Sequence, residues 1–180
     1  YSTGYTPPAS GGSNVQAFFA AAQYTGNGTS AAATQDITTD VDLSSGTGMV
    51  MTKRTDGTAS WFMTDTVRGG SKEFPVTSAA EGNTGLISSF NSDGYTLTGY
   101  GNTNTNVHEY LSYTFKKQDH FINCFQYVGN GTTQQIAHGL GSTPGLILVK
   151  RSGYHWGYWH KEFTGTSNGD YFNVNSGPAA

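Results

Sequence analysis

The feature that most constrains the fold of this chain is an internal repeat. Residues 18–30 read FFAAAQYTGNGTS, and residues 121–133 read FINCFQYVGNGTT. Two further pairs of segments match in the same order: 35–37 with 134–136, and 49–54 with 146–151. A repeat of this kind indicates two copies of one structural unit, each of which must bury its apolar face against a neighbour.

Turn signals and short apolar runs predict an all-β fold. The chain has 25 glycines, and Asn-Gly or Asp-Gly pairs, which favour tight hairpins, recur at Asn27-Gly28, Asp56-Gly57, Asp93-Gly94, Asn130-Gly131 and Asn168-Gly169. Residues 146–151 are apolar on both faces, as in a central strand of a sandwich. Residues 107–116 alternate like a half-exposed strand. We expect about ten strands or more.

One segment could form either a helix or a strand. Residues 15–23 are rich in Ala and Phe, which suits a helix, but the matching residues 121–127 contain β-formers and precede an Asn-Gly pair. We therefore predict a strand in both copies.

The repeat divides the chain into three parts. Residues 1–16 contain Pro-Pro and Gly-Gly pairs and are predicted to form an extended arm or linker. Residues 17–118 form a first β-sandwich module, and residues 119–180 a second, truncated one with no counterpart of residues 88–97 or 107–116. The truncation predicts open sheet edges, covered either by chain beyond Ala180 or by a strand from another subunit.

The charge of the chain argues against nucleic-acid binding, and its cysteine content argues against a catalytic thiol. The chain has 9 Lys and Arg against 12 Asp and Glu, a formal net charge of −3, so we expect no nucleic-acid partner. No apolar segment is long enough to predict membrane insertion. Cys124 is the one cysteine and matches Ala21 in the first copy, which favours a small buried strand residue over a nucleophile.

The sequence predicts no enzyme, cofactor or metal. Most carboxylates occupy turns, and the pairs His108 with Glu109 and His160 with Glu162 lack an accompanying nucleophile. The glycine-rich residues 138–145 precede a predicted strand rather than a helix, which argues against a nucleotide site.

The aromatic run at residues 154–160 is the strongest candidate for ligand binding. In a strand, aromatic rings would stack on sugars while histidines supply hydrogen bonds, so the predicted glycan-binding residues are Tyr154, His155, Trp156, Tyr158, Trp159 and His160. The alternative is that one face belongs to the core and the other meets a neighbouring sheet or subunit. His155 and His160 fall on opposite faces of a strand, which argues against a shared metal.

Residues 17–175 resemble a repeat module of uncharacterised domains in virion proteins of tailed bacteriophages. The resemblance is most specific at residues 136–151, after the YVGNGT motif, and includes Trp156, Trp159 and His160. Residues 38–46 depart from it, because the first copy lacks the His-Gly-Leu-Gly-Ser-Thr-Pro-Gly turn. The resemblance implies a jelly-roll, lectin-like β-sandwich and carries no catalytic residues.

The resulting hypothesis is a structural and adhesive component of a bacteriophage virion. The resemblance implies a tail fibre or other projecting appendage, with partners in copies of itself, other virion proteins and host-surface glycans. The first alternative is a secreted or cell-surface bacterial filament subunit or adhesin, assembled by exchange of the arm at residues 1–16. The second is a capsule-degrading tail enzyme, which would require a cleft with convergent carboxylates.

Overall fold

The computed structural model describes residues 15–30, 32–99, 101–162 and 171–172, and confirms an all-β sandwich. Helical structure in these residues is limited to a 3₁₀ turn, Val15–Ala17, and a single helical turn, α1 (Gly101–Asn104). The strands are β1 (Phe19–Thr25), β2 (Thr34–Thr38), β3 (Gly48–Arg54), β4 (Phe62–Asp65), β5 (Phe74–Pro75), β6 (Ile87–Asn91), β7 (Gly94–Thr98), β8 (Glu109–Lys116), β9 (Leu146–Lys150), β10 (Trp156–His160) and β11 (Tyr171–Phe172). The predicted arm lies almost wholly outside the described residues.

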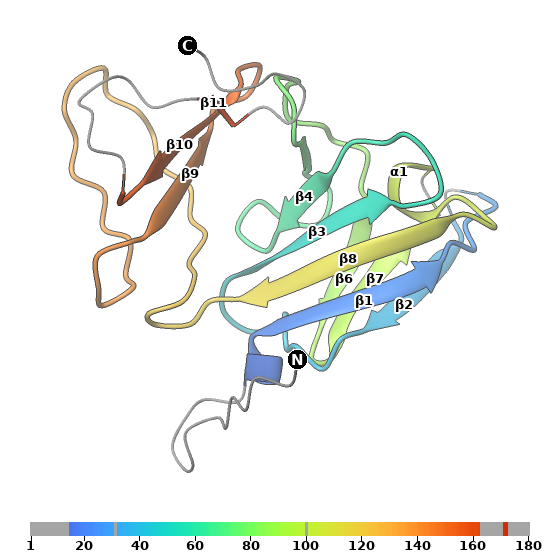
Figure 1. Cartoon of the computed structure of the whole chain (residues 1–180). Coiled ribbons are helices and arrows are strands. Elements are labelled where there is room, and N and C mark those ends of the chain that lie inside the picture. Colours follow the sequence, from blue (N-terminus) through green and yellow to red (C-terminus); the bar gives the residue numbers. More distant parts are fainter. Residues whose placement is uncertain (1–14, 31, 100, 163–170, 173–180) are drawn as a thin grey trace, which may run out of the picture.

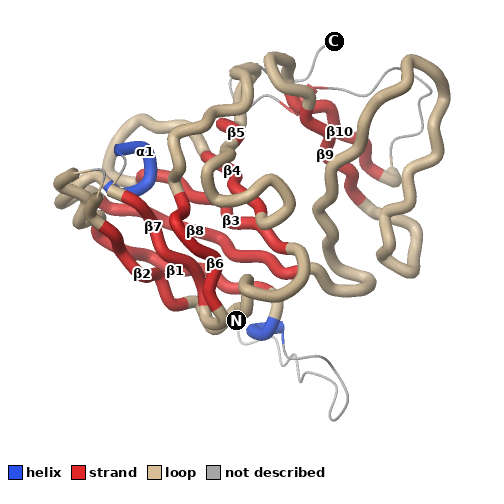
Figure 2. Tube along the Cα trace, turned by 180° about the vertical axis from the view of Figure 1, so that it is seen from behind, coloured by secondary structure: helices blue, strands red, loops and turns tan. Residues whose placement is uncertain are grey.

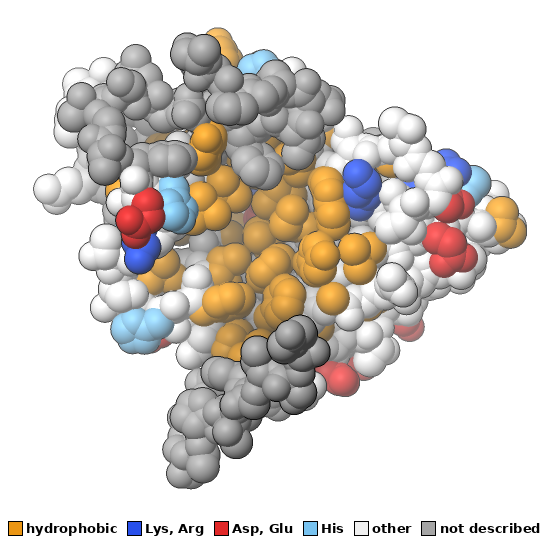
Figure 3. Space-filling model, in the orientation of Figure 1, with side chains coloured by type: hydrophobic (Ala, Val, Ile, Leu, Met, Phe, Trp, Pro, Cys, Tyr) orange, Lys and Arg blue, Asp and Glu red, His pale blue; other side chains and the backbone are white. Residues whose placement is uncertain are grey.

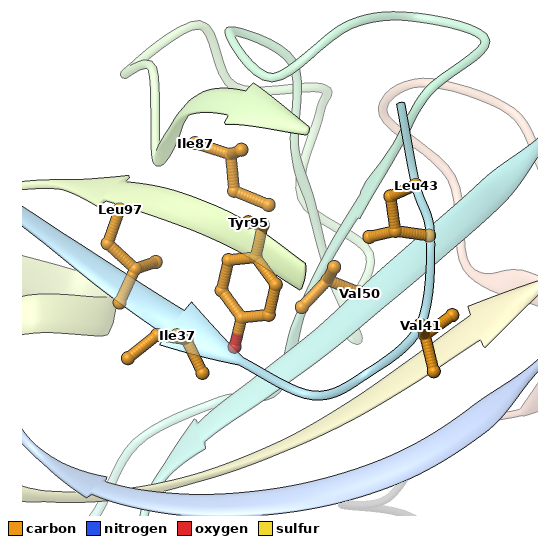
Figure 4. Packing of buried hydrophobic residues seen from close by; sticks show 7 residues of the cluster. All are labelled: Ile37, Val41, Leu43, Val50, Ile87, Tyr95 and Leu97. Atoms are coloured by element: carbon orange, nitrogen blue, oxygen red, sulfur yellow. The ribbon is translucent and has the colours of Figure 1, made fainter. Parts of the chain in front are cut away.

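The first copy of the repeat forms a two-layer sandwich (Figure 1). One layer is a five-stranded sheet in the order β1-β8-β3-β4-β5, and the other is a three-stranded sheet in the order β2-β7-β6. Strands of both sheets and the connection between β2 and β3 supply the core shown in Figure 4, which consists of Ile37, Val41, Leu43, Val50, Ile87, Tyr95 and Leu97. The jelly-roll and lectin-like detail stays a prediction.

Strand β8 faces the core with Tyr110 and with the small hydroxyl side chains of Ser112 and Thr114. Ser112 and Thr114 are fully buried, whereas Tyr113 and Phe115 are half-buried on the outer face of the five-stranded sheet. The hydrophobic pattern alone would place the aromatic side chains inward. The small hydroxyl side chains leave room for the fully buried rings of Tyr95 and Tyr110, so packing volume decides the orientation.

The second copy contributes three strands among the described residues, in the order β11-β10-β9. Residues 121–127 form no strand there, and the prediction of one is wrong; their one ladder contact is an isolated bridge between Ile122 and Gln118. Figure 2 shows this part of the chain as a long loop. The matching strand of the first copy, β1, pairs with β8 alone. The described residues of the second copy contain no counterpart of β8 with which residues 121–127 could pair.

The copies contact each other through Trp156. This side chain is 7% exposed and joins Met63, Phe74 and Val76 in a second apolar cluster. Its indole Nε1 donates to the backbone oxygen of Pro75 at 3.3 Å. The second copy is therefore anchored on the outer face of the five-stranded sheet of the first.

Candidate binding surface

The outer face of the five-stranded sheet carries aromatic and methionine side chains. Phe19, Phe115 and Met49 are in register across three neighbouring strands, and so are Ala21, Tyr113 and Met51. Residues directly opposite each other in antiparallel strands point to the same side of the sheet. The residues that alternate with them along each strand face the core, so the six side chains named above must face outward.

Aromatic rings gather at the end of this face nearest the second copy. The rings of Phe19 and Phe115 are 5.1 Å apart, and Phe121, which follows β8, lies 6.3 Å from Phe115. With Tyr113 these residues line a shallow depression of about 300 Å³. All four lining residues are aromatic, so the depression fits an apolar surface better than a polar ligand.

Figure 3 shows how far the apolar surface extends. Hydrophobic side chains gather in a hollow at the middle of this face of the molecule, between β9 and β10 at the left and the first copy at the right. On the side of the second copy, Leu146 and Leu148 lie on the same face of the β9–β10 hairpin as Trp156, which contacts the first copy, and are 54% and 39% exposed. We call this set of side chains the apolar face; its members are Phe19, Met49, Met51, Tyr113, Phe115, Phe121, Leu146 and Leu148.

A lysine over a tryptophan is repeated in both copies. Lys53 Nζ lies 5.9 Å from the ring of Trp61, and Lys150 Nζ lies 5.9 Å from the ring of Trp156. Lys150 also donates to the backbone oxygens of Thr77 and Tyr154. Desolvation by burial lowers the pKa of Lys150. The lysine thus helps hold the second copy on the first.

The predicted glycan-binding residues do not share one surface. Trp156, Tyr158 and His160 alternate along the face of β10 that carries the buried contact, and Tyr158 and His160 are half-buried. Trp159 points to the opposite face and is 40% exposed. Tyr154 is 52% exposed in the turn before β10, together with exposed His155.

Only part of the aromatic run is therefore open to a ligand. The buried indole of Trp156 contacts Phe74, with ring centroids 6.0 Å apart, and cannot serve as a stacking platform. The ring of Tyr154 is covered on one side by the Arg151 guanidinium, whose carbon is 3.9 Å from the centroid. The glycan hypothesis consequently depends on Trp159 and the uncovered side of Tyr154.

Acidic side chains at and near the pair His108 with Glu109 make local contacts. Asp56 accepts from Arg54 at 2.6 Å and lies 2.8 Å from His108 Nδ1. The Arg54 guanidinium, followed by His108, lowers the pKa of Asp56 to about 2. Glu109 accepts from Thr25 Oγ1 at 2.9 Å. These contacts fasten neighbouring strand ends and turns, and they converge on no cleft.

Two other titratable groups are perturbed by their surroundings. Lys116, with Ser44 and Ser45, holds the pKa of Asp42 well below its usual range and ties the loop before β3 to the end of β8. Burial raises the pKa of the Cys124 thiol to about 11, which makes it a poor nucleophile at neutral pH. Cys124 is half-buried, as expected for a small packing residue, but lies outside any strand.

The described part of the chain carries neither a metal-ligand cluster nor a membrane-spanning helix. Within it, no group of three His, Cys, Asp or Glu side chains could hold a metal ion. None of the helices in the same residues has the length and apolar character needed to cross a membrane.

Sequence reasoning missed the most prominent surface. The alternation at residues 111–115 reveals an aromatic face, but a hydrophobic pattern is ordinarily assigned to the core. The signal that could have identified the outward aromatic face lies on the opposite face of the same strand, β8. There, Ser112 and Thr114 are small enough for larger neighbours to fill the core around them.

A family model described as a domain of unknown function, DUF7483, matches residues 14–180. No curated protein matches the chain, and no solved structure does.

Proposed function

We propose that this chain, which belongs to the DUF7483 family of domains of unknown function, is a non-catalytic structural component of a bacteriophage virion. Its place would be a tail fibre or another projecting appendage, where copies of the chain assemble with one another and with other virion proteins. The virion assignment rests on the resemblance of residues 136–151 to repeat modules of phage virion proteins.

The proposal of a structural role is supported mainly by the apolar face. Five of its eight side chains are half-buried, and Phe121, Leu146 and Leu148 are 44%, 54% and 39% exposed. Apolar side chains that gather on a surface in this way favour an interaction site. Aromatic and methionine side chains are also enriched at protein interfaces, whereas lysine and glutamate are depleted there. The face therefore favours a subunit that buries aromatic surface in an assembly.

The test of assembly is the mass of the purified chain in solution. Sedimentation equilibrium over a range of protein concentrations should give a defined oligomer, and Phe115→Ser should shift it towards monomer by removing a central ring of the apolar face. Val107→Ser is the matched control, because Val107 is 70% exposed in the turn before β8, away from this face. A monomer at every concentration would contradict the assembly role.

The virion location needs a separate experiment. Antibodies against the chain, applied to native phage particles and viewed by electron microscopy, should label a tail or projecting appendage. Labelling of bacterial surface filaments instead would support the alternative filament subunit. Particles without label, from a lysate that contains the protein, would overturn the virion assignment while leaving the oligomer measurement intact.

An adhesive role is the second part of the proposal. The exposed indole of Trp159 and the exposed ring of Tyr154 are the observations that favour it, since aromatic faces stack on sugars. Binding of the chain to a panel of bacterial surface polysaccharides should be lost in Trp159→Ala and kept in Phe121→Ala. If the chain binds no polysaccharide of the host, or if Trp159→Ala leaves binding unchanged, the glycan-site proposal is wrong.

A further inference from the structure

The same four-residue sequence occurs at matching places in the two copies of the repeat. Residues 26–29 and residues 129–132 both read Gly-Asn-Gly-Thr. The side chain of an asparagine can be attacked by the backbone nitrogen of the residue that follows it, and glycine hinders this attack least because it has no side chain. Since the local sequence is the same, a difference in reactivity between Asn27 and Asn130 must come from the structure.

Hydrogen bonds to Asn104 hold the site in the first copy. Asn104 is fully buried, and its side chain accepts from Asn27 N at 2.9 Å and donates to Asn27 Oδ1 at 3.2 Å. Gly28 N, the nitrogen that would attack, donates to the backbone oxygen of Asn104 at 2.8 Å. The reaction at Asn27 therefore requires a local opening that breaks these bonds.

Close packing around Gly28 adds to this restraint. A Cβ atom built on Gly28 would lie 2.3 Å from the backbone oxygen of Asn104 and 2.8 Å from the Cα atom of Gly99. Other segments of the first copy thus enclose the backbone at Gly28. Its nitrogen has little room to rotate towards the side chain of Asn27.

The site in the second copy has none of these restraints among the described residues. All residues from 125 to 135 are exposed. Gly131 has a φ of 76°, which glycine adopts without strain, and a Cβ atom built there would have nothing within 4 Å. Within the described part of the chain, no backbone hydrogen bond uses Gly131 N as its donor. This nitrogen can therefore approach the Asn130 side chain without breaking a backbone contact.

Two donors point at the side-chain oxygen of Asn130. Thr132 donates to Asn130 Oδ1 from its backbone nitrogen at 3.0 Å and from its hydroxyl Oγ1 at 3.1 Å. This oxygen gains negative charge when the carboxamide carbon is attacked. Donors that are already directed at a developing charge stabilise the transition state, so the contacts with Thr132 favour the reaction.

We propose that Asn130 is a site of spontaneous deamidation, and that hydrogen bonding to Asn104 protects Asn27 from the same reaction. Gly131 N forms a bond to Asn130 Cγ and gives up its proton to water, and the Asn130 amide nitrogen leaves as ammonia. The product is a five-membered succinimide ring. Water then opens the ring at either carbonyl carbon and leaves aspartate or its β-linked isomer, isoaspartate, without any oxidation or reduction.

The reaction changes both the charge and the backbone of this loop. Either product adds one negative charge to a chain whose formal net charge is −3. Aspartate keeps an acceptor for both donors of Thr132, and hydrogen bonds to a charged acceptor are the stronger kind. Isoaspartate instead routes the main chain through the former side chain, lengthens it by one carbon atom and alters the turn at residues 130–132.

The experiment follows the native full chain during incubation in buffer. Samples are digested at intervals, and mass spectrometry measures conversion separately in the peptides that contain residues 27, 130 and 168, since the third Asn-Gly pair lies outside the described residues. Conversion at Asn130 should be faster than at Asn27 by about tenfold or more, because local opening must precede the reaction at Asn27. Equal rates at these two residues, or no conversion at Asn130, would overturn the proposal.

The pH dependence and the products provide a second readout. Conversion at Asn130 should accelerate as the pH rises, because the attacking nitrogen must lose its proton. Isoaspartate should accumulate together with aspartate, because the succinimide can open at either carbonyl carbon. Aspartate formed without isoaspartate would mean direct hydrolysis of the carboxamide and would contradict the proposed route.

The denatured chain is the matched control for the effect of structure. In concentrated urea both Gly-Asn-Gly-Thr sequences lose their surroundings, so Asn27 and Asn130 should react at similar rates. Comparison with the native chain then measures the protection of Asn27. If Asn130 reacted much faster than Asn27 in urea as well, the difference would come from the flanking sequence, and protection by Asn104 would be refuted.

The variant Gly131→Ala tests the attacking group. It places a methyl group beside the attacking nitrogen at an exposed position and should slow conversion of Asn130 severalfold while leaving Asn27 unchanged. Val128→Ala is the control, because Val128 is 86% exposed in the same loop and its replacement leaves Gly131 unhindered. An unchanged rate at Asn130 in Gly131→Ala would exclude the succinimide and overturn the proposal.

Discussion

Trp156 and Trp159 lie on the same strand in opposite environments. Trp156 is 7% exposed inside an apolar cluster, and Trp159 is 40% exposed on the other face of β10. Replacement of a buried large side chain by alanine costs about 3–5 kcal/mol, whereas exposed substitutions usually change stability by about 0.5 kcal/mol or less. We expect Trp156→Ala to be strongly destabilising and Trp159→Ala to be nearly neutral.

Urea denaturation followed by circular dichroism measures the difference between these two variants. The unmodified chain and Trp159→Ala should unfold at similar urea concentrations. Trp156→Ala should unfold at a much lower urea concentration than either. Equal losses in the two variants would mean that the contact between the copies contributes little to stability.

At the scale of the element, β8 carries hydroxyl groups into the core that lack hydrogen-bond partners. The Thr114 hydroxyl oxygen is buried with no partner in the described structure, whereas Thr98 on β7 donates to Gly85 O at 2.6 Å. Valine has nearly the same shape as threonine and no hydroxyl to desolvate. We expect Thr114→Val to raise the free energy of unfolding by about 1 kcal/mol and Thr98→Val to lower it by about the same amount.

Thermal unfolding of the two valine variants checks this prediction. The midpoint should rise for Thr114→Val and fall for Thr98→Val relative to the unmodified chain. A fall for Thr114→Val as well would indicate that an internal water satisfies its hydroxyl, because buried waters commonly bridge such groups.

At the scale of the whole molecule, the two copies differ in their capacity to fold alone. The first copy holds both sheets of the sandwich and all seven residues of its main core cluster. The second supplies a small sheet whose strand β9 has most of its side chains exposed. We expect residues 14–118 to fold as an isolated fragment and residues 119–180 to remain without stable tertiary structure.

Dispersion of ¹H–¹⁵N correlation spectra distinguishes these outcomes. The fragment 14–118 should give dispersed signals, lower stability than the full chain and stronger binding of the dye ANS, because Met63, Phe74 and Val76 lose the cover of Trp156. Dispersed spectra of 119–180 alone would show that this part of the chain folds without the first copy.

The sequence by itself determined the class of the fold and its internal duplication. Asn-Gly turns and period-two alternation are local properties, so the residues alone are enough to place the strands at 109–116 and 146–150.

Tertiary structure decided which face of each strand is covered and which strand-like segments become strands. Alternation shows that β8 has two faces, but only packing against Tyr95 turns Ser112 inward and leaves Tyr113 outside. Residues 121–127 match β1 in sequence and still form no strand, because a strand requires a hydrogen-bonding neighbour. Trp156 is likewise buried by the first copy, a long-range contact that its local pattern does not contain.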